Sequence, residues 1–110
     1  MHNTIWAAGL LEGEGCFSKH VRKSNNCVAY AIHCEMTDED VINKLYSIFN
    51  VGTIVPRLNV SGRKDKAVRK QSWIWSVQNK VGILYVLRSI QPYMFSRRLA
   101  KINEIIKDLE

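Results

Sequence analysis

The sequence has 110 residues, of which 46% are apolar, so it predicts one domain spanning residues 1–110 with a single core. No apolar run is long enough to cross a bilayer, and no basic-then-apolar leader opens the chain, so neither a membrane protein nor a secreted one is predicted. The net charge of +6, from 16 basic and 10 acidic residues, favours a polyanionic partner.

The basic residues gather in two segments, residues 19–23 and 57–70. Such clustering is typical of a nucleic-acid-binding surface, although a solvated loop can also be basic. The cysteines are odd in number and lack metal-ligand spacing, so we interpret Cys16, Cys27 and Cys34 as buried free thiols. This interpretation predicts an intracellular, reducing compartment such as the cytoplasm, nucleoid or an organelle matrix.

The first predicted element is a helix whose apolar and small residues run from Ile5 to Leu11, with Asn3 or Thr4 as its N-cap. It ends in the run Glu12-Gly13-Glu14-Gly15. Ala8, Gly9 and Gly13 leave a helix face with almost no side-chain bulk, which another backbone could approach. Two carboxylates at a helix C-terminus are unfavourable by roughly 0.3–1 kcal/mol each, and a bound cation would remove that penalty. The alternative is that the glycines simply end an amphipathic helix.

The remainder of the chain predicts two hairpins and three helices. Four alternating segments are typical of strands: residues 16–23, 27–34, 53–60 and 71–78. Three segments with helical periodicity follow the hairpins or close the chain: residues 37–49, 80–90 and 96–109. Thr37 and Ser96 are expected to cap their helices, and Pro92 to stop the one before it. Trp73 and Trp75 are in phase with Val77, which favours core packing over base stacking.

The outward positions of the four strands form one polar face. Its residues are of types that read base edges in a major groove: Ser18, His20, Arg22, His33, Thr53, Arg57, Asn59, Ser76 and Gln78. The basic segment between the last two strands adds three phosphate-binding candidates: Lys66, Arg69 and Lys70. A strand of nine or ten residues rises about 30 Å, which corresponds to about nine base pairs.

The nine residues from Ala7 to Gly15 resemble the signature of the LAGLIDADG homing endonucleases. Seven of the nine positions match in residue or in type, if Glu at both Asp positions is counted as a match in type, and Ala7 stands in place of the leading Leu. Residues 49–52 and 90–98 resemble two further stretches of the family. The resemblance implies an α+β fold: the family's αββαββα core with an extra C-terminal helix and a four-stranded, antiparallel, saddle-shaped sheet.

The resemblance also implies a metal site and an active-site cation. Glu14 matches the family's metal-binding acid, with the Gly15 carbonyl as companion ligand, and the expected ion is Mg²⁺ (or Mn²⁺). Arg97 matches the family's active-site Lys, and its neighbour Arg98 remains open as the alternative. Arg is a permanent cation, so it would stabilise charge rather than carry a proton.

One position departs from the family. A water-positioning Gln often ends the second strand, but by register Met36 falls there, and Met cannot hold water by hydrogen bonding. Either Glu35 takes over this catalytic role or the active site is weakened.

A single signature implies a homodimer on double-stranded DNA, with Ala8, Gly9, Glu12 and Gly13 where the two first helices meet. The resemblance therefore predicts a site-specific endonuclease, of the kind carried by introns and mobile elements, that makes a metal-dependent double-strand break at a long pseudo-palindromic site. The alternative is a non-cleaving nucleic-acid-binding protein of the same fold, an RNA maturase or a DNA-binding regulator. Acids at both signature positions favour the enzyme, whereas Met36 favours the binder.

Overall fold

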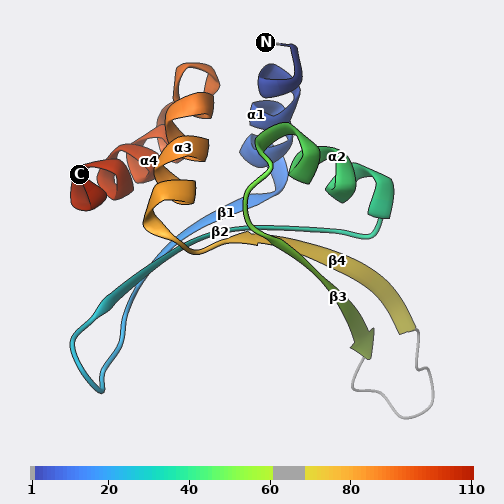
Figure 1. Cartoon of the computed structure of the whole chain (residues 1–110), viewed down its shortest axis with the longest axis horizontal. Coiled ribbons are helices and arrows are strands. Elements are labelled where there is room, and N and C mark those ends of the chain that lie inside the picture. Colours follow the sequence, from blue (N-terminus) through green and yellow to red (C-terminus); the bar gives the residue numbers. More distant parts are fainter. Residues whose placement is uncertain (1, 61–68) are drawn as a thin grey trace.

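The structure is a computed structural model that describes residues 2–60 and 69–110. Its elements follow the predicted order (Figure 1): α1 (His2–Glu14), β1 (Gly15–Val21), β2 (Val28–Met36), α2 (Glu39–Phe49), β3 (Thr53–Val60), β4 (Arg69–Val77), α3 (Lys80–Ile90), a 3-10 turn (Gln91–Tyr93) and α4 (Ser96–Leu109). The strands form one antiparallel sheet in the order β1-β2-β4-β3. The predicted α+β class is confirmed.

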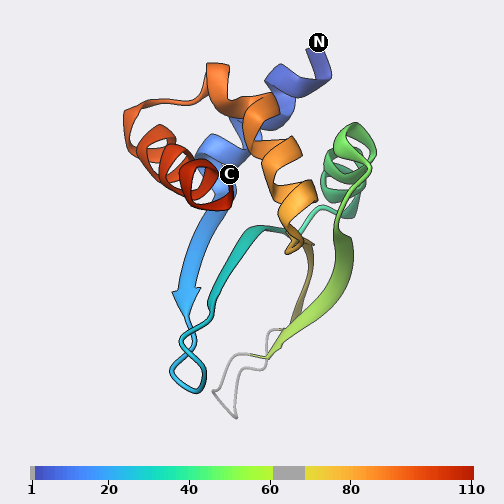
Figure 2. The same cartoon turned by 60° about the vertical axis from the view of Figure 1, so that its left-hand side comes forward.

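The sheet consists of two hairpins that meet along a short central seam. β1 is paired with β2, and β3 with β4, over the full length of β1 and β3. β2 and β4, in contrast, pair only between Ile32–Met36 and Trp73–Val77. Beyond this seam the two hairpins diverge as separate arms (Figures 1 and 2).

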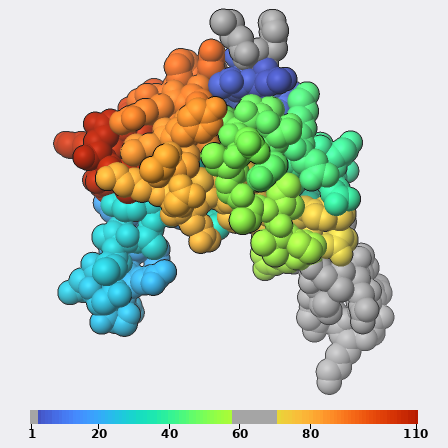
Figure 3. Space-filling model, viewed as in Figure 1, coloured from blue at the N-terminus to red at the C-terminus, as the bar shows by residue number. Residues whose placement is uncertain are grey.

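The helices lie together on one side of the arched sheet (Figures 1 and 2). In the part of the chain that the structure describes, no helix covers the opposite, concave face, and the space-filling view shows it hollowed below the helices (Figure 3). Among the described residues, no helix has the length and apolar character needed to span a bilayer. The fold therefore leaves one face of the sheet open to a partner.

Alternation along the strands builds the core. Phe17, Ile32 and Val77 point toward the helices and are buried. Trp75 is fully buried and stacks on Phe49 at a ring-centroid distance of 5.9 Å. The prediction that this tryptophan packs in the core is confirmed, because its ring has no surface left for a base.

The cysteine prediction is only partly right. Cys34 is buried on the core side of β2, and burial, followed by the charge of Glu14, raises the pKa of its thiol to about 11. Cys16 and Cys27 are exposed, because one lies on the concave face and the other in the turn between β1 and β2. All three thiols are free.

Three predicted N-caps are wrong by one or more residues. α1 begins at His2, ahead of both Asn3 and Thr4. Asp38, not Thr37, caps α2 by its backbone position, and Phe95 precedes α4, of which Ser96 is the first residue. These helices are held by packing of their apolar faces, so a side-chain cap does not decide where they start.

Candidate active site and nucleic-acid interface

A row of small polar side chains crosses the centre of the concave face. Cys16, His33, Ser76 and Thr53 are successive cross-strand partners on β1, β2, β4 and β3. His33 Nδ1 and Ser76 Oγ lie 3.0 Å apart, within hydrogen-bond distance. The row combines donors and acceptors on a face that no helix of the described chain covers.

The predicted DNA-reading residues follow the same alternation. Those whose side chains are described are half-buried or exposed: Ser18, His20, Arg22, His33, Thr53, Arg57, Ser76 and Gln78. Lys66 lies outside the described residues, and so do the side chains of Asn59, Arg69 and Lys70. Ser18, His20, Arg22, His33 and Gln78 also line a hollow on the first arm.

A second hollow lies where α1 ends against the sheet. Its volume is about 520 Å³, and it is lined by Glu14, Cys16, His33, Glu35, Arg57 and Ile74. We call it the Glu14 pocket. It brings two carboxylates and one guanidinium from three separate elements to one place on the concave face.

Glu35, not Met36, faces this pocket. Cys34 is buried on the core side of β2, so alternation turns Glu35 to the concave side and Met36 back toward the core. Met36, which the resemblance matched to the family's water-positioning Gln, is therefore not among the residues that line the pocket, whereas the Glu35 carboxylate is.

Ser72 and Arg57 are among the residues that contact the Glu35 carboxylate. Ser72 Oγ donates a hydrogen bond to Oε2 at 2.5 Å, and Arg57 Nη1 lies 3.6 Å from Oε1. Ser72 is 1% exposed although it belongs to the concave face of β4. Sequence reasoning missed it, since one Ser in a polar alternation gives no signal of a buried partner.

The two signature carboxylates differ in environment. Glu14 is exposed at the last residue of α1 and lines the pocket. Glu12 is half-buried, and its Oε2 is buried with no hydrogen-bond partner among the described residues. A buried acceptor without a donor is unfavourable, so Glu12 Oε2 still needs a donor from outside the described residues.

The two arginines of α4 that are candidates for the active-site cation also differ in their contacts. Arg98 donates from Nη1 to the Gly15 carbonyl, and its Cζ lies 5.9 Å from the Phe17 ring centroid. Arg97 is exposed one residue earlier. The carbonyl expected as a metal ligand is therefore paired with a guanidinium, and a metal ion there would require Arg98 to move.

The exposed face of α1 is narrower than predicted. Ala8 is 1% exposed and belongs to the chain's own core, so its assignment to a dimer interface is wrong. Gly9 and Gly13 are exposed, and a Cβ added at either would have no neighbour within 4 Å. Ile5, 46% exposed, lies one turn before Gly9 on the same face.

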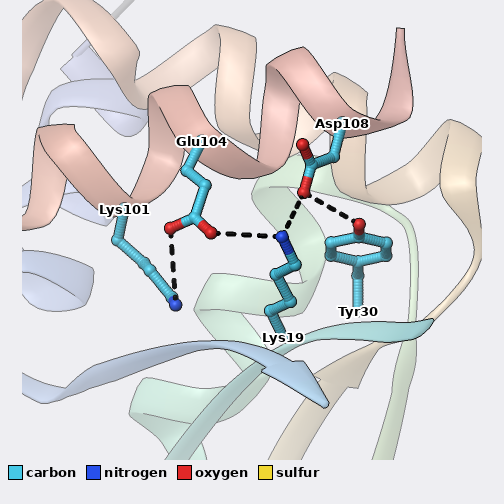
Figure 4. Close-up of polar contacts among 5 residues, drawn as sticks. All are labelled: Lys19, Tyr30, Lys101, Glu104 and Asp108. Carbon is cyan, nitrogen blue, oxygen red and sulfur yellow. Dashed lines mark hydrogen bonds and ion pairs between the residues drawn. The ribbon is translucent and has the colours of Figure 1, made fainter. Parts of the chain in front are cut away.

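A polar cluster ties α4 to the first hairpin (Figure 4). Lys19 Nζ donates to Asp108 at 2.6 Å and to Glu104 at 3.2 Å, while Tyr30 Oη donates to Asp108 at 2.9 Å. Hydrogen bonds from Lys19 and Tyr30 lower the pKa of Asp108, and those to Asp108 and Glu104 raise the pKa of Lys19. The sequence signal that could have predicted this cluster is Lys19, a charged residue on the core side of an alternating strand. We call this group the α4 clasp.

The Glu14 pocket has the donors that a hard cation needs. No three His, Cys, Asp or Glu side chains in residues 2–60 and 69–110 converge closely enough to hold a metal by themselves. Mg²⁺, however, commonly takes one or two carboxylates and completes its shell with water and substrate phosphate. Glu14 and Glu35 fit that pattern, because both line the pocket on the face open to a partner.

Comparison with known proteins agrees with this geometry. A model of the LAGLIDADG endonuclease family matches residues 7–108. The chain belongs to the LAGLIDADG endonuclease family. No curated protein matches the sequence significantly.

Solved LAGLIDADG structures share this fold at low sequence identity. The homing endonuclease I-CvuI, solved in complex with its target, is 16% identical with a TM-score of 0.73, over 98% of this chain and 68% of its own. I-GzeII, solved with a DNA target, is 16% identical with a TM-score of 0.73, over 96% of this chain but 34% of its own. An archaeal intron-encoded homing endonuclease, I-Vdi141I, solved with DNA, is 16% identical with a TM-score of 0.68, over 98% and 69%.

Proposed function

We propose that the chain is a site-specific DNA endonuclease that works as a homodimer and makes a Mg²⁺- or Mn²⁺-dependent double-strand break at a long pseudo-palindromic site. The observation that carries the proposal is the Glu14 pocket, in which Glu14 shares a hollow with Glu35 and Arg57 on the open face of the sheet. Family membership and a fold found in endonucleases solved with DNA support it.

The concave face has the reach of half a recognition site. β2 and β4 have nine residues each, and strands of that length rise about 30 Å. That rise follows about nine base pairs, so two copies would cover about eighteen to twenty. Arg22, Arg57 and Gln78 supply the donors and acceptors for base edges, and the basic segment around Lys66 supplies phosphate contacts.

The chemistry would be divided among few side chains. Glu14 and Glu35 supply oxygen ligands, and a bound divalent cation polarises the scissile phosphate and lowers the pKa of water. Glu35 accepts a hydrogen bond from that water and so orients it. Arg97, exposed at the start of α4, stabilises the negative charge that develops on the phosphate, while Arg98 positions the chain at Gly15.

The homodimer would form through the exposed face of α1. Gly9 and Gly13 let a second backbone approach, and Ile5 adds apolar contact. Glu12 lies on the neighbouring turn with an unmet acceptor, which a donor from the second copy would satisfy. In this arrangement the two Glu14 pockets would lie close together, one for each DNA strand. We also infer an intracellular, reducing compartment, because Cys16 and Cys27 carry exposed free thiols.

The second candidate is a non-cleaving binder of the same fold. The pairing of the Gly15 carbonyl with Arg98 favours it, because a cation of the protein already occupies one expected ligand. Incubation of a plasmid library with Mg²⁺ or Ca²⁺ separates the two. Linear product that forms only with Mg²⁺ supports the endonuclease, and retarded but intact DNA with both ions supports the binder.

Removal of the Glu14 charge tests the proposed chemistry. We expect Glu14→Gln to abolish cleavage while DNA affinity changes little, because Gln keeps the shape of the side chain but is a poorer ligand for a hard cation. Glu39→Gln, at an exposed position in the first turn of α2, is the matched control and should cut normally. Cleavage by Glu14→Gln at the unmodified rate would contradict the assignment.

A further inference from the structure

Arg57 belongs to two sites at once. It projects from β3 on the concave face, where a base or phosphate of bound DNA would contact it, and it lines the Glu14 pocket. Its Nη1 lies 3.6 Å from Glu35 Oε1. The same guanidinium therefore faces the proposed DNA surface and neutralises one of the two carboxylates proposed to hold the cation.

The ion pair between these residues is easily exchanged. The side chains are 58% and 37% exposed, and ion pairs this open to solvent contribute little because water screens them. DNA phosphates or a guanine edge would offer Arg57 a competing partner of at least equal strength. A divalent cation would likewise offer Glu35 a partner with twice the charge of Arg57.

Glu35 does not depend on Arg57 for its position. The buried Ser72 donates to Oε2, the carboxylate oxygen that Arg57 does not approach. Because Ser72 holds one carboxylate oxygen from within the sheet, the Glu35 side chain keeps its position when Arg57 leaves. Ser72 is a positioning residue in this arrangement, and Arg57 is a removable counter-ion.

We propose that Arg57 and the divalent cation compete for Glu35, so that Arg57 keeps the metal site weak until DNA draws the guanidinium away. This inference rests on the proposed endonuclease function and adds a coupling between target binding and metal binding. By linkage, metal on Glu35 also releases Arg57 and strengthens DNA binding by the same factor. With this coupling, the protein binds the divalent cation tightly only when DNA is already bound.

The first test measures Mn²⁺ binding to the DNA-free protein by electron paramagnetic resonance of the unbound ion. Arg57→Gln should tighten Mn²⁺ binding about two- to fivefold, the range set by an exposed ion pair. Arg57→Lys keeps the charge and should bind as the unmodified protein does. Arg88→Gln, which removes an exposed arginine of α3 that is also ion-paired, with Glu110, but lies outside the Glu14 pocket, is the matched control and should change Mn²⁺ binding less than twofold.

A double-mutant cycle on DNA binding tests the other direction of the coupling. With a short labelled duplex of arbitrary sequence in EDTA, Glu35→Gln should tighten binding about two- to fivefold when Arg57 is present. The gain should shrink when Arg57 is already Gln, whereas the effect of Glu14→Gln on duplex affinity should be small and the same in both backgrounds. Ca²⁺ should tighten duplex binding more for the unmodified protein than for Arg57→Gln.

The outcomes separate this coupling from the nuclease itself. Mn²⁺ affinities that are equal, or weaker in Arg57→Gln, overturn the coupling, and plasmid cleavage in the same preparation leaves the endonuclease standing. Tighter Mn²⁺ binding in Arg57→Gln, together with no plasmid cleavage by the unmodified protein, supports the competition at Glu35 and overturns the endonuclease. A protein that neither binds Mn²⁺ nor cuts DNA overturns both.

Discussion

Two residues hold the backbone beside Glu14: Gly15, which has no side chain, and Arg98, which lies near the other end of the sequence. A Cβ at Gly15 would lie 2.6 Å from the Leu11 carbonyl oxygen, so only glycine allows α1 to turn into β1 this tightly. Arg98 then caps the Gly15 carbonyl and covers Phe17. The position of the signature acid therefore depends on α4 as well as on α1.

At this scale the two neighbouring arginines should have separable effects. Arg98→Ala should lower the free energy of unfolding by about 1–2 kcal/mol, because it removes a charged hydrogen bond and the stem packed near Phe17. Arg97→Ala should leave unfolding unchanged and slow cleavage. Urea titration measures the free energy of unfolding of both variants, and plasmid cleavage measures their activity. If Arg97→Ala lost stability and Arg98→Ala lost only cleavage, the two roles would be exchanged.

The element that most needs explanation is the last helix. The α4 clasp joins the C-terminal turn of α4 to the middle of the first hairpin, with Lys19 and Asp108 separated by 89 positions in sequence. It braces the arm that presents Ser18 and His20 against the helical layer.

Weakening of the clasp by Asp108→Asn should lower thermal stability at neutral pH. The folded-state pKa of Asp108 lies below its ordinary value of 3.8, so the stabilisation is present above that value and lost as pH falls through the folded-state pKa. Melting temperatures of the unmodified protein and the variant should therefore differ at pH 7 and converge in strong acid. A gap that stays constant down to that range would show that the Asp108 charge is not responsible.

Sequence patterns predicted the elements well and their contacts poorly. Period-two alternation and helical spacing are local, so they identified the strands and α-helices of the described residues, though not the 3-10 turn, and they put Trp75 and Val77 in the core. Alternation also placed Cys34 in the core, but it carried no signal that Glu35 shares a pocket with Glu14 of α1 and Arg57 of β3. The bonds of Ser72, Arg98 and Asp108 join distant segments, and no local pattern encodes them.

For the molecule as a whole, the proposed dimer depends on the exposed face of α1. The glycines of α1 leave an exposed strip that no described residue covers, and the described part of the concave face presents the acidic Glu14 pocket. Cleavage of two strands needs two such pockets, so assembly and activity should be lost together.

Gly9→Leu tests this assembly with little effect on the single chain. Because a Cβ at Gly9 meets no atom within 4 Å, the protomer should fold, while Leu side chains should hold two α1 helices apart. We expect the unmodified protein to sediment as a dimer and the variant as a monomer, or as insoluble protein, without cleavage. Asn43→Leu, an exposed site on α2, controls for added hydrophobic surface. A monomeric unmodified protein bound to a single half-site would refute the dimer.

The short seam between β2 and β4 also bears on how such a protein changes over evolutionary time. Five residues of each strand join the hairpins, and the Glu14 pocket lies beside that junction. Each arm beyond it has its own strand pairing. Substitutions at one arm's end should leave the opposite arm's register intact. The proposed target preference should therefore change one arm at a time while the central pocket stays the same.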